Sequence, residues 1–105
     1  MYKGTTPTFT LTLPEEIDLT DATEVRVTFA NRNSRILADK TGSDLAIDGN
    51  TIGVFLTQQE TLGFPAGSVF IQVNWLYNDE GTVKRAASDI AVAFFQQNLW
   101  NEVMA

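Results

Sequence analysis

The strongest hydrophobic pattern in the chain is a run of ten residues, Ser68–Tyr77, that lies between Gly67 and the polar stretch 78–81. Every second side chain of the run is apolar, so an extended strand carries them all on one face. They are Val69, Ile71, Val73, Trp75 and Tyr77. The opposite face mixes apolar and amide side chains. This pattern is typical of a strand in the middle of a sheet, and the rest of the chain is expected to supply its neighbours.

Six further segments have the composition and length of strands. They cover residues 7–13, 23–30, 34–40, 45–48, 51–57 and 82–95. In the first, Phe9, Leu11 and Leu13 alternate with threonines, which predicts a half-buried strand with one wet face. Prolines at both of its ends, which cannot donate to a β-ladder, favour an edge position.

Two of the connections are predicted to be tight hairpin turns. Asp48-Gly49-Asn50 fits a two-residue turn in either of two registers, one that sets Leu45 opposite Ile52 and one that sets Ile47 opposite Ile52. Asn78-Asp79-Glu80-Gly81 fits the second hairpin, with Gly81 at a position of positive φ.

Two other connections are predicted to hold at most one helical turn each. The acidic stretch 15–22 is interpreted as a loop that tucks Ile17 and Leu19 onto the core. Thr57-Gln58-Gln59-Glu60 has the form of a capping box, which predicts a single turn through Leu62 that ends at Gly63.

The last predicted strand, 82–95, is interrupted near Ala87-Ser88-Asp89, and Asp89 is interpreted as a bulge or edge carboxylate. Beyond it, Ile90, Val92 and Phe94 share one phase, and Phe95 is assigned to an outer face. The tail 96–105 carries Leu99, Trp100, Val103 and Met104 at helix-like spacing. Because it is too short for a stable free helix, it is expected to pack on its own domain or on a neighbouring chain.

Short strands separated by turns predict an all-β fold, a seven-stranded antiparallel immunoglobulin-like sandwich with at most one short helical turn. The Cys…Trp…Cys pattern of antibody domains is absent, and a small β-barrel is the alternative. We expect one domain over residues 1–98 and a tail, 99–105, that forms an interface.

The composition narrows the classes of partner. The 105 residues are 44% hydrophobic and 19% charged, which suits one domain with one core. The net charge of −6 disfavours nucleic acid and anionic membranes as partners. The chain has no cysteine, no apolar run after Met1–Gly4 and no stretch that could span a bilayer. We therefore expect a protein made in the cytoplasm without a signal peptide.

The sequence carries little sign of catalytic chemistry. It has no histidine for general-base work, no cysteine nucleophile and no Gly-rich phosphate loop. Glu15, Glu16, Asp18 and Asp21 lack the spacing of a calcium loop. We therefore expect no enzyme, and we assign no catalytic, cofactor-binding or metal-ligating residue.

Several large apolar side chains are expected outside the core. If they lie on neighbouring strands, they form a contiguous patch that marks a contact with another chain. The interface candidates are Phe55, Phe70, Leu76, Phe95, Trp100 and Met104.

Short motifs along nearly the whole chain carry a resemblance to a known class. They are Gly4-Thr5-Thr6-Pro7-Thr8, Asp48-Gly49-Asn50-Thr51, the run 56–64, Ile71-Gln72-Val73 and Ala87-Ser88-Asp89-Ile90. With them the chain resembles small proteins encoded in the tail region of phages and prophages of Gram-positive bacteria. It is more distantly similar to the immunoglobulin-like N-terminal domain of phage baseplate upper proteins. The resemblance implies a β-sandwich virion or tail-assembly component, and it carries over no functional residues.

Two functions are therefore expected in turn. The first is a structural or assembly protein of a phage tail or baseplate, a virion component that contacts other tail proteins or copies of itself. The alternative is a carbohydrate-binding module that stacks sugars on Trp75, Tyr77 and Trp100.

Overall fold

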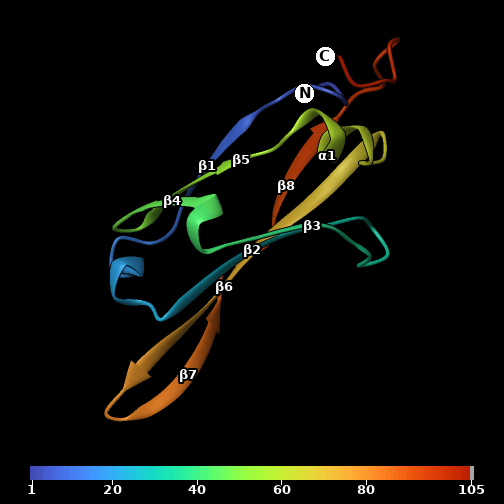
Figure 1. The fold of residues 1–105 in the computed structure, drawn as a ribbon. Coiled ribbons are helices and arrows are strands. Elements are labelled where there is room, and N and C mark those ends of the chain that lie inside the picture. Colours follow the sequence, from blue (N-terminus) through green and yellow to red (C-terminus); the bar gives the residue numbers. More distant parts are fainter. Residues whose placement is uncertain (105) are drawn as a thin grey trace.

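Two antiparallel sheets pack face to face in the computed structural model, which describes residues 1–104 (Figure 1). The small sheet has the strand order β1 (Thr8–Thr12), β5 (Thr51–Phe55) and β4 (Leu45–Asp48). The large sheet runs β3 (Ile36–Thr41), β2 (Glu24–Ala30) and β6 (Gly67–Asp79), and its last edge holds β7 (Thr82–Ala87) and β8 (Ala91–Phe95). The connections include the 3-10 turns η1 (Leu19–Asp21) and η2 (Gly42–Asp44) and the helix α1 (Gln58–Leu62). The predicted all-β sandwich is confirmed, with eight strands in place of seven, and the sheets do not close into a barrel.

Strand β6 is the predicted central strand. It pairs with β2 from Phe70 to Leu76 along one edge, while β8 and then β7 occupy its other edge. Val69, Ile71 and Val73 are buried as expected, and Trp75 packs partly buried against the core. Tyr77 is 36% exposed, because the β6–β7 hairpin projects beyond the small sheet (Figure 1).

The predicted edge strand and hairpins also form. Strand β1 pairs only with β5, and its Phe9 is buried. Between β4 and β5, Ile47 lies opposite Ile52, which selects the second of the two registers allowed by the turn sequence. Gly81 in the β6–β7 turn has φ +85, as its position predicts.

A β-bulge separates β7 from β8 where the sequence predicted an interruption. Asn74 pairs with Ala87 and Ile71 pairs with Ala91, so four residue steps on this edge oppose three on β6. Ser88 fills the gap, since its hydroxyl accepts a hydrogen bond from the Val73 N–H at 3.0 Å and its own N–H donates to the Val73 carbonyl at 2.8 Å. An extra residue reverses which side chains face the core beyond that point.

The bulge corrects the assignment of Phe95 to an outer face. Phe95 is fully buried, because beyond Ser88 the odd-numbered side chains turn toward the small sheet. Its ring lies 5.1 Å from that of Phe64 and 6.3 Å from that of Phe9, measured between centroids. Phe29 lies 5.9 Å from Phe64 and 5.7 Å from Phe9, which completes a closed ring of four phenylalanines between the sheets.

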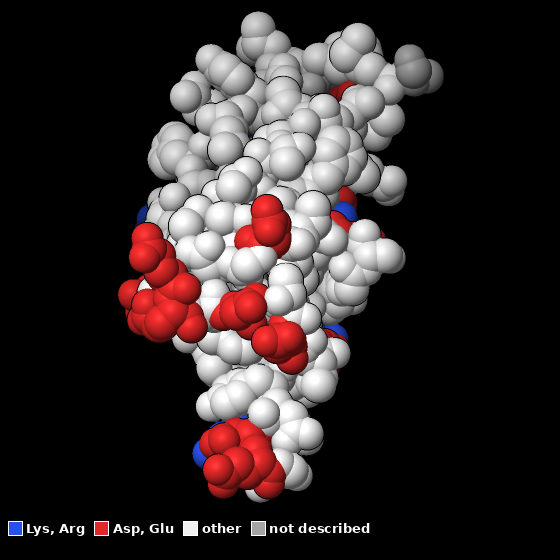
Figure 2. All heavy atoms as spheres, turned by 90° about the vertical axis from the view of Figure 1, so that its left-hand side faces the viewer, with Lys and Arg blue, Asp and Glu red and all other residues white. Residues whose placement is uncertain are grey.

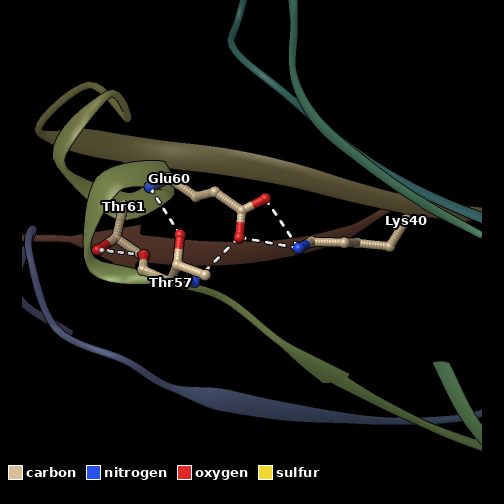
Figure 3. A network of polar contacts seen from close by, with 4 residues as sticks. All are labelled: Lys40, Thr57, Glu60 and Thr61. Carbon is tan, nitrogen blue, oxygen red and sulfur yellow. Dashed lines mark hydrogen bonds and ion pairs between the residues drawn. The ribbon is translucent and has the colours of Figure 1, made fainter. Parts of the chain in front are cut away.

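Helix α1 carries the chain from the small sheet to the large sheet through the predicted capping box. The Thr57 hydroxyl accepts from the Glu60 N–H at 3.2 Å, and the Glu60 carboxylate accepts from the Thr57 N–H at 2.9 Å. The same carboxylate lies 2.8 Å from the Lys40 ammonium on β3, and Thr61 donates to the Thr5 carbonyl (Figure 3). One side chain, Glu60, therefore both caps the helix and ties it to the large sheet.

The Glu60 carboxyl makes stability depend on pH. Burial alone raises its pKa, but hydrogen bonds from Lys40 and Thr57 and the charge of Lys40 outweigh burial, so its pKa is lowered from 4.5. We expect Glu60→Gln to lower the unfolding free energy at pH 7 by about 1 kcal/mol, since both roles are lost. A lowered pKa stabilises the fold above the unfolded value, so this difference should shrink as the pH falls below 4.5. Urea titrations at several pH values measure it.

The matched control for this experiment is Asp79→Asn. Asp79 pairs with Lys84 at 2.7 Å, but both side chains are about half exposed, so the pair contributes little. A Glu60→Gln variant no less stable than the control at pH 7 would refute the role of Glu60.

The phase reversal predicts opposite outcomes for neighbouring phenylalanines. Phe95→Ala should lower the unfolding free energy by about 3–5 kcal/mol, because it opens a cavity in the ring of phenylalanines. Phe94→Ala should change it by less than about 1 kcal/mol, since Phe94 is 60% exposed. If Phe95→Ala leaves too little folded protein to measure, Phe95→Leu should still cost more than Phe94→Leu. Equal losses, or the reverse order, would contradict the bulge.

Candidate functional site

The outer face of the large sheet carries a row of apolar residues that crosses four strands. Ala30 on β2 pairs with Ile36 on β3 and with Phe70 on β6, and Phe70 pairs with Val92 on β8. Paired residues share a face, and the flanking positions Val69 and Phe29 point into the core. The row therefore lies on the side of the sheet that faces away from the sandwich.

Two more side chains widen this row along the β8 edge. The bulge turns Ile90 and Phe94 to the same side as Val92, and Phe94 pairs with Ser68 of β6. We call the whole set the outer patch. It consists of Ala30, Ile36, Phe70, Ile90, Val92 and Phe94.

The members of the outer patch at the sheet margins are unusually exposed for their size. Ile36 is 63% exposed, Phe94 is 60% exposed, and Ile90 and Val92 are each 59% exposed. Single exposed apolar residues are ordinary, but contiguous ones of this number mark contact sites.

The other half of the same sheet face is polar. Arg26 on β2 bridges to Asp39 on β3 at 2.7 Å and to Glu24 at 3.7 Å. Arg85 on β7 donates two hydrogen bonds to the Asn74 side chain on β6. The sheet therefore has one half solvated by charge and one half, toward Phe94, without it.

The outer patch also encloses a shallow hollow of about 360 Å³. Ile36, Phe70 and Ile90 form its apolar wall, and Arg32 from the β2–β3 loop stands at its rim. Within residues 1–104, Arg32 and its neighbour Arg35 have no carboxylate within 4.0 Å. The rim of the patch is thus basic on a chain with a net charge of −6.

The six predicted interface residues do not form one patch. Only Phe70 belongs to the outer patch. Phe55, 51% exposed, lies on the small sheet, and Leu76 lies in the polar half of the large sheet, opposite Glu24 and Arg85. Phe95 is in the core, and Trp100 and Met104 lie in the tail.

The remaining members of the patch were missed because strict alternation was continued through Ser88. The signal that could have found them was the Ala87-Ser88-Asp89 interruption itself. A one-residue bulge there turns Ile90, Val92 and Phe94 outward and leaves Phe95 inside. Asp89 is exposed in the bulge, as the interpretation of a bulge carboxylate requires.

The C-terminal tail does not form the helix suggested by its spacing. It lies beside the N-terminus and α1, where Asn98 donates to the Lys3 carbonyl and the Gln58 amide exchanges two hydrogen bonds with the Met104 backbone (Figure 1). Leu99, Trp100, Val103 and Met104 are all more than half exposed. The last residue of the predicted tail, Ala105, lies outside the described residues.

The predicted sugar-stacking aromatics are divided between two sites. Trp75 and Tyr77 line a hollow of about 460 Å³ between β6 and the 16–22 loop, together with Glu16, Asp18 and Asp21. Trp100 lies in the tail, outside this hollow. Hydrogen bonds from the Thr20 hydroxyl and N–H lower the pKa of the Asp18 carboxyl.

Acidic side chains collect on the face shown in Figure 2, over the middle of the molecule and at the tip below it. Across residues 1–104, no three carboxylates are grouped closely enough to hold a metal ion. No helix in that range has the length and apolar character needed to cross a membrane.

In comparisons with known proteins, no family model, no curated protein and no solved structure matches the chain.

Proposed function

We propose that the protein is a structural or assembly component of a phage or prophage tail or baseplate, and that it acts through protein–protein contacts. The observation that carries this proposal is the outer patch, in which four side chains that are about 60% exposed border a partly buried phenylalanine. The resemblance of the 4–8 and 56–64 motifs to tail-region proteins supplies the biological setting.

The physical case for a contact rests on the composition of the patch. Burial of apolar surface contributes about 25 cal/mol per Å², and a patch of several hundred Å² is the usual size of an interaction site. Phe94 and Phe70 supply the aromatic anchors that commonly dominate binding energy. Arg32 at the rim favours an acidic margin on the partner.

Assembly into particles tests the proposal. We expect the chain to be found by mass spectrometry in tailed particles purified after induction of the prophage that encodes it. Ile36→Glu should reduce its incorporation at least about tenfold, because a carboxylate in the patch centre must be desolvated on contact. Val83→Glu is the matched control, since Val83 is 62% exposed on the same sheet face but in its polar half. Absence of the wild-type chain from intact particles would contradict the proposal.

A second candidate, carbohydrate binding, is favoured by the hollow that Trp75 and Tyr77 share with three carboxylates. Aromatic faces and acidic hydrogen-bond acceptors together suit a sugar ring with its hydroxyls.

A fluorescence titration separates this candidate from the first. In the Trp100→Phe variant Trp75 is the remaining tryptophan, so soluble cell-wall glycans should quench its emission with a saturating curve. The control is Trp100→Phe combined with Tyr77→Ala, which should weaken the response because one wall of the hollow is lost. No change in emission at millimolar glycan would exclude this candidate.

A further inference from the structure

Strand β8 has an open edge. It pairs only with β6, and a hollow of about 440 Å³ separates its start, at Ile90 and Ala91, from β1 of the small sheet. At the other end, the Met1 nitrogen donates to the Phe94 carbonyl and the Gln96 N–H donates to the Met1 carbonyl. These bonds identify the groups of β8 that point away from β6.

Val92 presents unpaired backbone groups at this edge. Alternate residues of an antiparallel strand direct both N–H and C=O to the same side. Because the Phe94 carbonyl points outward to Met1, the N–H and C=O of Val92 point outward as well. Within residues 1–104, no backbone hydrogen bond from another strand or loop reaches them.

The other edge strands are protected against pairing, and β8 is not. Charged or proline residues at an edge oppose the addition of another strand. β3 carries Asp39 and Lys40, β4 carries Asp48, β7 carries Lys84 and Arg85, and β1 lies between Pro7 and Pro14. The sequence of β8 is Ala-Val-Ala-Phe-Phe, without charge or proline.

The edge of β8 is also complementary to itself. When two copies pair antiparallel about Val92, each Ile90 lies opposite the other copy's Phe94, an aromatic–aliphatic pair of the kind that stabilises sheets. Asp89 then lies opposite Phe95 and not opposite another acid. Two chains of net charge −6 can therefore meet here without bringing like charges together.

We propose that β8 pairs antiparallel with β8 of a second copy of this chain, with Val92 on the two-fold axis. The large sheets then continue across the dimer, and the two outer patches join into one surface. This deepens the proposed function and rests on it in using the same patch, since it names a second copy as one of the partners.

Sedimentation velocity on the full chain at increasing concentration tests the pairing. Wild type should shift from 11.6 kDa toward twice that mass. Val92→Lys should weaken dimerisation at least about tenfold, because each edge then presents a charge to the other. Val83→Lys, equally exposed on β7, should dimerise as wild type does. Thermal unfolding confirms that both variants are folded, as expected for two exposed side chains.

Crosslinking fixes the register. The chain has no cysteine, so Val92→Cys introduces a single thiol. Directly opposed residues in a hydrogen-bonded pair have Cα atoms about 5.5 Å apart, within disulfide range. Mild oxidation should give a covalent dimer with Val92→Cys and none with Val83→Cys.

Three results would overturn the pairing: a wild-type monomer at high micromolar concentration, equal loss in the Val92→Lys and Val83→Lys variants, or no disulfide at position 92. A monomer that is still incorporated into tail particles would refute the pairing alone. A dimer that is absent from particles would refute the proposed function alone.

Discussion

One extra residue between Ala87 and Ala91 decides what the protein keeps inside and what it presents outside. Four steps on this edge face three on β6, and Ser88 takes up the difference with hydrogen bonds to both backbone groups of Val73. Because side chains alternate along a strand, the shift moves every residue of β8 to the opposite face. The same bulge therefore places Phe95 in the core and Ile90, Val92 and Phe94 on the surface.

The two consequences of the bulge depend on each other. Phe95 completes the ring of phenylalanines that joins β1, β2 and the segment after α1, so the shifted register is held by core packing. With that register fixed, the apolar side chains of β8 cannot turn inward without expelling Phe95. Their exposure is a requirement of the fold, and it makes the outer patch a stable feature of the surface.

Sequence patterns predicted the fold well where a local rule decides the structure. Alternation identified β6 and β1, the turn residues identified both hairpins, and Thr57 with Glu60 identified the capped helix. The candidate site was not predicted, because it depends on register across strands far apart in the chain. Phe70 was assigned correctly to an outer face, but its neighbours Ile36 and Val92 follow only from the β2, β3 and β8 pairings.

Hydroxyl-radical footprinting of the native protein, read at single residues by mass spectrometry, tests the bulge most directly. Side chains in solvent react quickly, and buried ones of the same type react slowly. The structure predicts rapid modification of Phe94, which is 60% exposed, and protection of Phe95, which is fully buried. Protection of Phe94 with rapid modification of Phe95 would mean that alternation runs unbroken through Ser88, and both the core and the outer patch described above would be wrong.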